Sequence, residues 1–218
     1  MIISGGFMDI ALMLMDFVGT IAFAISGAIL GVKKNMDIFG INILAITTAC
    51  GGGIIRDIII GDIPPKAFRD PFYVGVAVVV ANAIFLWLCL HKHLPHKIVS
   101  WYDQLVFWFD TLGLAAFTVD GVMIGINSGY SKNIFLIVFL GFITGVGGGA
   151  LRDIMAVQMP DILRKHVYAV ASIAGGCLMS LLYAYTRQEE IALLSGFIGV
   201  VVLRYLAAKN EWNLPKVK

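Results

Sequence analysis

The sequence predicts an all-α polytopic membrane protein whose seven transmembrane helices form two inverted three-helix repeats plus one extra helix. The first observation is composition: 59% of the 218 residues are hydrophobic and only 14% are charged. Second, seven apolar segments are each about 20 residues long, the length that crosses a bilayer. Third, the same spaced residues occur twice along the chain. No segment alternates apolar and polar residues over its length, as a barrel strand does, so we expect helices.

The seven apolar segments give the expected spans in chain order. Short connections that contain Gly, Pro or charged residues separate most of them. No Lys or Arg precedes the first segment, so we expect no cleaved signal peptide. The expected spans are roughly residues 10–30, 38–59, 72–91, 105–126, 134–156, 167–186 and 190–207.

An internal repeat relates the first three spans to the next three. The offset is about 94 to 96 positions, and small changes in loop length explain the difference. An odd number of spans turns the second unit upside down relative to the first. We expect one transmembrane domain over 1–218, with repeat one at about 10–92, repeat two at about 104–186 and a seventh helix at about 190–207. The matched pairs are Asp16/Asp110, Gly19/Gly113, Phe23/Phe117, Gly27/Gly121, Gly31/Gly125, Thr48/Thr144, Arg56/Arg152, Asp57/Asp153, Pro64/Pro160, Arg69/Arg164 and Tyr73/Tyr168.

Positive charge predicts the orientation. Of the 16 Lys and Arg residues, five lie on the side of the N-terminus and eleven on the side of the C-terminus. Because cytoplasmic loops carry the excess of positive charge, we expect the N-terminus outside and the C-terminus in the cytoplasm, in the plasma (inner) membrane. The formal net charge of +2 is too small to indicate nucleic acid binding, so the lipid bilayer is the expected partner.

Two glycine triplets are the most informative motifs. Each lies late in an apolar span and is followed by Arg-Asp. Glycine costs roughly 1 kcal/mol per helical residue relative to alanine, so a triplet predicts a break in the helix. Broken helices in corresponding positions of two halves are typical of a permeation or substrate site. Tight packing of small residues is the alternative. The triplets are Gly51, Gly52 and Gly53, and Gly147, Gly148 and Gly149.

Charged residues inside the spans predict two ion pairs. Asp16 and Ser26 lie on one stripe of the first helix, and Asp110 and Asp120 lie on the equivalent stripe of the fourth. A carboxylate within a span normally faces the bundle interior or water, although Asp16 and Asp110 could instead cap or snorkel at the interfaces. From their depth in the membrane we expect the pairs Asp16–Arg56 and Asp110–Arg152, each beside a glycine triplet.

Two threonines and four further glycines complete the expected path and its packing. Thr48 and Thr144 precede the triplets by one turn, where their hydroxyls could line a pore or bond back to the helix. Thr48, Thr144, Ser26 and Asp120 are the candidate polar residues that line the ion path. Four glycines at GxxxG spacing are expected to pack helices closely. They are Gly27, Gly31, Gly121 and Gly125.

The remaining motifs predict no enzyme and no metal site. Residues 145–150 match a dinucleotide-binding pattern, but they lie in a span rather than in a strand-turn-helix unit. The three cysteines lack paired spacing and are expected to be reduced and apolar. A histidine cluster beside two lysines suits an interfacial basic loop better than metal ligation or pH sensing. The cysteines are Cys50, Cys89 and Cys177, and the histidines are His91, His93 and His96.

The two GGGxxRD motifs, the duplicated unit and the seventh helix resemble the prokaryotic trimeric intracellular cation channel (TRIC) family, also filed as glycine-transporter-domain or UPF0126-type membrane proteins. The resemblance covers about residues 8–208. It implies a homotrimer with one pore per protomer between broken helices two and five. It also implies conduction of monovalent cations, with K⁺ preferred and no cofactor. The Lys-Glu-Val motif of animal members is absent, so their lipid gating is not expected here. A secondary transporter of a small solute such as glycine is the alternative function, and an intramembrane enzyme or a structural protein is less favoured.

Overall fold

A computed structural model describes residues 7–90, 96–164 and 167–212 of the chain. Within these ranges, seven helices are long and apolar enough to cross a membrane. They are α1 (Phe7–Lys33), α2 (Ile38–Ile60), α4 (Phe72–Leu90), α5 (His96–Gly125), α6 (Ile134–Met155), α8 (Val167–Thr186) and α9 (Glu189–Lys209). The short helices are α3 (Lys66–Arg69), α7 (Asp161–Arg164) and the π-helix η1 (Ile126–Tyr130), which extends α5. The predicted fold class is confirmed.

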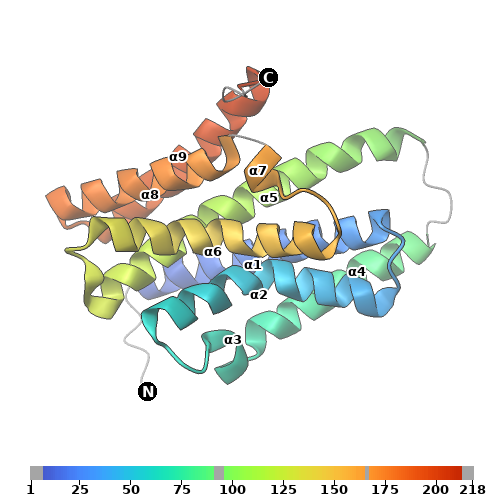
Figure 1. Cartoon of the computed structure of the whole chain (residues 1–218), viewed down its shortest axis with the longest axis horizontal. Coiled ribbons are helices and arrows are strands. Elements are labelled where there is room, and N and C mark those ends of the chain that lie inside the picture. The colour runs from blue at the N-terminus through green and yellow to red at the C-terminus, as the bar shows by residue number, and fades with distance from the viewer. Residues whose placement is uncertain (1–6, 91–95, 165–166, 213–218) are drawn as a thin grey trace.

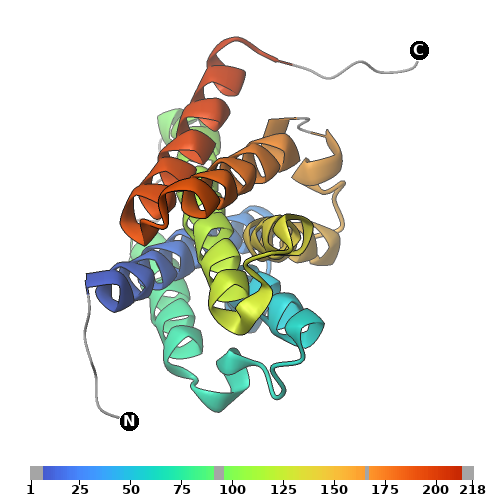
Figure 2. The same cartoon turned by 90° about the vertical axis from the view of Figure 1, so that its left-hand side faces the viewer.

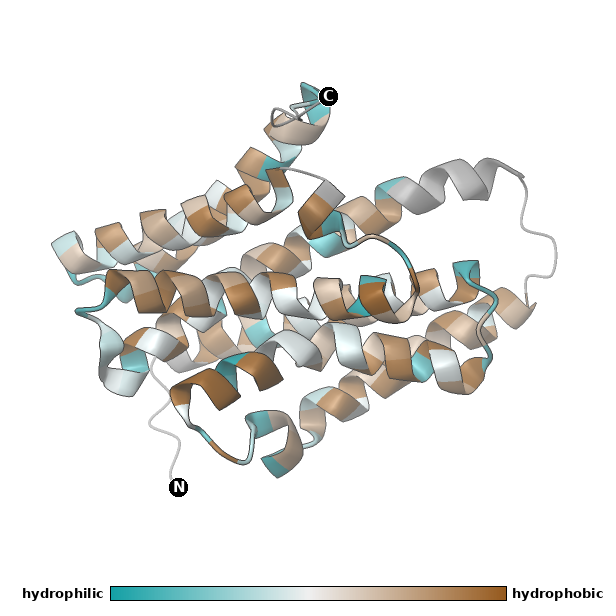
Figure 3. Cartoon of the chain, viewed as in Figure 1, coloured by the Kyte–Doolittle hydropathy of each residue, from teal (hydrophilic) through white to brown (hydrophobic). Residues whose placement is uncertain are grey.

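The bundle is organised around α5, which is the most deeply buried span (Figures 1 and 2). It packs against α1, α6, α8 and α9, while α2 packs against α1, α4 and α6. Side by side, α2 and α6 run in opposite directions, as expected for inverted units (Figure 1). Hydrophobic residues follow the helices along their length, and many hydrophilic residues lie at helix ends and connections (Figure 3). This distribution suits a bundle surrounded by lipid.

Equivalent caps begin α2 and α6. The Asp37 side chain accepts a hydrogen bond of 2.7 Å from the Gly40 backbone N–H, and the Asn133 side chain accepts one of 3.1 Å from the Leu136 N–H. Such caps satisfy backbone donors that the first helical turn leaves free. The two caps fix where each triplet-bearing helix enters the bundle.

The predicted helix breaks at the glycine triplets are wrong. Residues 51–53 lie inside the continuous helix α2, and residues 147–149 lie inside the continuous helix α6. Positive-φ glycines among the described residues are Gly61 and Gly129, both outside the triplets. The helices stay intact because close helix packing outweighs the intrinsic cost of glycine.

Candidate functional site

The triplets are the contact between α2 and α6. A Cβ atom added at Gly52 would lie 2.1 Å from the Thr144 carbonyl oxygen, and one added at Gly148 would lie 2.0 Å from the Thr48 carbonyl oxygen. No side chain larger than hydrogen fits at either position. The two backbones therefore meet directly, and the alternative interpretation of the triplets as packing surface describes this structure.

The other four glycines pack α1 against α2 and α5 against α6, as predicted. Added Cβ atoms at Gly27 and Gly121 would lie 2.6 and 2.5 Å from the hydroxyl oxygens of Thr48 and Thr144. Gly31 and Gly125 lie one turn further along, where they face Ile41 and Ile137 respectively. Each repeat thus holds its first two helices together through the same small-residue contact.

Both threonine hydroxyls bond back to their own helix. Thr48 Oγ1 donates to the Leu44 carbonyl at 2.5 Å, and Thr144 Oγ1 donates to the Leu140 carbonyl at 2.6 Å. Each acceptor is four residues earlier, which is the usual way to satisfy a hydroxyl inside an apolar helix. The Thr144 side chain also borders the cavity described below.

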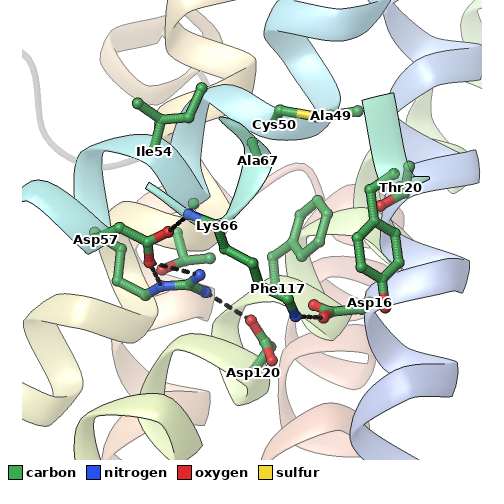
Figure 4. Close-up of a pocket in the computed structure, with 14 residues that line it drawn as sticks. Asp16, Thr20, Ala49, Cys50, Ile54, Asp57, Lys66, Ala67, Phe117 and Asp120 are labelled. Carbon is green, nitrogen blue, oxygen red and sulfur yellow. Dashed lines mark hydrogen bonds and ion pairs between the residues drawn. The ribbon is translucent and has the colours of Figure 1, made fainter. Parts of the chain in front are cut away.

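A cluster of charged side chains lies at the C-terminal end of α2, which we call the Arg56 end. The Arg56 side chain is buried, and its Nη1 donates to Asp120 Oδ2 at 2.7 Å. Arg56 Nε donates to Asp57 Oδ1 at 2.9 Å, and Asp57 Oδ2 accepts from the Lys66 backbone N–H at 2.8 Å. Lys66 Nζ reaches Asp16 Oδ2 at 3.0 Å (Figure 4). Three carboxylates and two cations are therefore connected in one network.

This network borders a cavity of about 50 Å³ (Figure 4). A water molecule needs roughly 10–15 Å³ of such volume, so the cavity has room for a few waters or for one partly hydrated cation. Residues with carboxylate and hydroxyl groups line it, and oxygens of these kinds are the ligands that hard cations prefer. The residues around it include Asp16, Thr20, Cys50, Gly53, Arg56, Asp57, Lys66, Tyr73, Phe117, Asp120 and Thr144.

The predicted pair Asp16–Arg56 is wrong. Arg56 binds Asp120 from the other repeat, and Asp16 binds Lys66 from the connection after α2. Depth in the membrane placed Asp16 and Arg56 at the same level, but it could not specify the direction in which each side chain points. The cation that pairs with Asp16 is Lys66 and not Arg56.

The equivalent cluster at the C-terminal end of α6, which we call the Arg152 end, contains the second predicted pair. Arg152 Nη1 donates to Asp110 Oδ1 at 2.8 Å and to Ser26 Oγ at 2.5 Å. Its Nε donates to Asp153 Oδ1 at 2.9 Å, as Arg56 does to Asp57. The predicted pairing of Asp110 with Arg152 is confirmed.

The two ends differ at one repeat position. Ser26 occupies in repeat one the place that Asp120 occupies in repeat two, and each contacts the arginine of the opposite repeat. From the opposite repeat, therefore, a carboxylate contacts Arg56 and a neutral hydroxyl contacts Arg152. The Arg56 end carries the additional negative charge.

Four members of these clusters were not predicted from the sequence. Asp57 and Asp153 were visible as the last letter of each GGGxxRD motif, but no partner was assigned to them. Lys66 and Arg204 were counted only toward the orientation of the chain. An arginine inside the apolar segment 190–207 was the available signal for Arg204, since a charge in a span normally has a buried partner.

One of the three cysteines borders the cavity. His91, His93 and the His96 side chain lie outside the described residues. Cys50 borders the cavity, whereas Cys89 is exposed on α4 and Cys177 is partly exposed on α8. Within the described residues, no three His, Cys, Asp or Glu side chains gather in a way that could hold a metal ion.

Comparison with known proteins gives consistent results over nearly the whole chain. The family model described as "Glycine transporter" matches residues 13–89 and again residues 107–184. The UPF0126 inner membrane protein YadS of Escherichia coli (strain K12) is 36% identical over 204 residues, which cover 92% of this chain and 93% of that protein.

Solved structures agree with the sequence matches. A structure described as the structural basis for conductance through TRIC cation channels has a TM-score of 0.81 and 33% identity, covering 94% of this chain and 96% of that one. The TRIC trimeric intracellular cation channel orthologue from Rhodobacter sphaeroides has a TM-score of 0.81 and 29% identity, covering 92% and 98%. The chain therefore belongs to the UPF0126 family of integral membrane proteins, the family of the prokaryotic TRIC channels.

Proposed function

We propose that this protein is a monovalent cation channel that prefers K⁺, with one path in each protomer of a homotrimer in the plasma (inner) membrane. The observation that carries the proposal is the similarity of 94% of the chain to a TRIC cation channel of the same fold at 33% identity. The trimer and the membrane come from the descriptions of the R. sphaeroides and E. coli relatives. We infer that the protein transports ions and is not an enzyme.

The charged cavity at the Arg56 end supports a cation path that begins there. Asp16, Asp57 and Asp120 carry three formal negative charges, against two positive charges on Arg56 and Lys66. The excess of one negative charge attracts cations and repels anions, and the low-dielectric walls strengthen the field. Ions would enter beside Lys66, whose side chain is 47% exposed.

The α2–α6 contact would form the constriction that closes the path. Beyond the cavity, the Gly52 and Gly148 contacts join the two backbones. The rings of Phe23 and Phe117 meet edge to face nearby, with centroids 5.2 Å apart. Gly52 and Gly148 present no side chains to the opposite helix, so α2 and α6 could separate at these two positions, with Leu151 leaving Gly51 and Ile55 leaving Gly147. We propose that this separation opens the path and that the structure has the closed arrangement.

Reconstitution of purified protein in a planar bilayer tests the function. Under a KCl gradient, a cation channel has a reversal potential close to the K⁺ equilibrium potential. Replacement of K⁺ by Na⁺ on one side then measures the preference between the two ions. A reversal potential close to that of Cl⁻ would contradict the proposal.

The same recording separates a channel from a carrier. A channel produces discrete unitary currents that far exceed carrier turnover, whereas a secondary transporter of glycine produces current only when glycine is present. Absence of unitary events, together with glycine-dependent current, would establish the carrier alternative.

A further inference from the structure

The seventh helix contributes a buried arginine to the Arg152 end. Arg204 on α9 is 5% exposed, although α9 lies outside both repeats. The carbon at the centre of its guanidinium lies 4.8 Å from the centroid of the Phe107 ring and 4.7 Å from that of Tyr168. Its Nη2 is 3.9 Å from Asp110 Oδ2. Two aromatic rings and one carboxylate thus hold this cation inside the bundle.

A lysine has the same relation to its neighbours at the Arg56 end. Lys66 Nζ lies 3.0 Å from Asp16 and 5.2 Å from the centroid of the Tyr73 ring. Asp16 and Tyr73 are the repeat counterparts of Asp110 and Tyr168. Each end therefore has a cation next to a tyrosine and the aspartate of the first helix of its repeat. The cations differ in origin: Lys66 comes from the connection after α2, and Arg204 comes from α9.

The two cations differ most in how they are held. The Lys66 side chain is 47% exposed, whereas that of Arg204 is 5% exposed and packs against two rings. With Arg204, the cluster of Asp110, Asp153 and Arg152 has a formal charge of zero. Without Arg204 the cluster would have an excess of one negative charge, as the Arg56 end has. Arg204 therefore cancels the charge that would attract a cation.

Three polar atoms around Arg204 point to a ligand position. Asp110 Oδ2, Tyr168 OH and Arg204 Nε are buried, and none of them makes a hydrogen bond of ordinary geometry with a described residue, although Asp110 Oδ2 lies 3.9 Å from Arg204 Nη2. Buried polar atoms without partners are rare, because they have lost water without replacing it. Two of the three are oxygens of the kind that coordinate a monovalent cation or a water molecule.

We propose that Arg204 determines whether cations pass the Arg152 end: it is a tethered cation that occupies Asp110 in place of a permeating ion. A cation can bind Asp110 and Tyr168 only when the guanidinium leaves its position against the rings of Phe107 and Tyr168. This inference rests on the proposed channel function and adds a residue that controls the second half of the path.

Removal of the charge at Arg204 tests the inference in bilayer recordings. We expect Arg204→Gln to raise the unitary K⁺ current by roughly threefold or more, with the larger gain for ions that enter from the Arg152 end. Arg204→Lys keeps the charge and should give currents close to those of the unchanged protein. Lys209→Gln is the matched control, because it removes one positive charge from the exposed end of the same helix.

A second variant keeps the Arg204 guanidinium and removes one of the aromatic rings that hold it. Phe107→Leu removes one of the two rings against Arg204, so we expect the channel to be open for a larger fraction of time at unchanged unitary current. Phe107→Leu still tests whether Arg204 controls the passage of cations if Arg204→Gln does not fold. Thermal unfolding and size-exclusion chromatography would reveal such a failure. Unchanged open probability in Phe107→Leu, or unchanged current in folded Arg204→Gln, would overturn the inference.

A crystallographic readout separates this inference from the proposed function. Crystals of Arg204→Gln grown in a rubidium salt should show anomalous density beside Asp110 and Tyr168, and crystals of the unchanged protein should show none there. A rubidium peak without any K⁺ current would support the cation site and contradict the channel. A different result would support the channel and contradict the role of Arg204. In that case the unchanged protein conducts K⁺, while Arg204→Gln shows neither a rubidium peak nor a change in K⁺ current.

Discussion

Substitution of Gly52 by alanine tests the contact between α2 and α6. The new methyl group would lie 2.1 Å from the Thr144 carbonyl oxygen and 2.9 Å from its carbonyl carbon. Ordinary contact begins at 3.4 Å, so the helices must move apart by about 1.3 Å. The obstacle is backbone, which cannot rotate away as a side chain can.

The expected loss of stability follows from two opposing contributions. Alanine favours the helix by about 1 kcal/mol relative to glycine. Overpacking of a tight contact costs about 1–3 kcal/mol, and a backbone obstacle places Gly52→Ala at the upper end. The net decrease in the free energy of unfolding is about 2 kcal/mol, which lowers the melting temperature by about 4–8 °C for a chain of this length.

Gly53 provides the matched control on the same helix. An added Cβ there first meets Arg56 Nη2, at 3.6 Å, which is an ordinary contact. Gly53→Ala keeps the gain in helix propensity without the overpacking, so its melting temperature should be unchanged or up to about 4 °C higher. The assay is thermal unfolding of the purified protein in detergent. Equal melting temperatures for the two variants would refute the direct backbone contact.

Three further predictions concern residues that border the cavity. Asp120→Asn leaves the buried Arg56 with one carboxylate partner, so the free energy of unfolding should fall by about 3 kcal/mol; a decrease below about 1 kcal/mol in thermal unfolding would show that the pair is unimportant. Lys66→Met removes the cation that pairs with Asp16 and should increase the K⁺ current in bilayers. Arg69→Met removes an exposed cation and should leave the current unchanged. A decrease in current for Lys66→Met would contradict the role of the cavity. Thr144→Val loses a hydroxyl already bonded to its own helix, so both the unfolding free energy, within about 1 kcal/mol, and the K⁺ current should be retained.

The spans and their order could be predicted because hydrocarbon constrains length and composition so strongly. The observed helices begin and end close to the apolar segments, apart from α5, which begins earlier at His96. The duplicated residues also predicted equivalent contacts. Gly27 and Gly121, for example, face the threonines that precede the two triplets. Hydrophobic periodicity depends only on neighbouring residues, and a repeat is found by comparing the chain with itself. Both signals can therefore be read from a single sequence.

The helix breaks were mispredicted because propensity is a local quantity and the contact that overrides it is not. Glycine weakens an isolated helix, yet it also permits two helices to approach until their backbones meet. Gly52 and Gly148 face each other's helices across the bundle, and nothing in either triplet alone reveals that neighbour. The same limit explains the wrong pairing of Asp16: depth follows from position in a span, whereas the direction of a side chain depends on how the helices pack.

Accessibility of position 53 tests the central claim, that the cavity at the Arg56 end lies on the cation path. Gly53→Cys would be made in a background in which the three native cysteines are replaced by serine, and K⁺ currents would be recorded during treatment with charged methanethiosulfonate reagents. We expect a positively charged reagent to block the current and to react at least about tenfold faster than a negatively charged one of similar size. Equal rates, or modification that leaves the current unchanged, would contradict the claim.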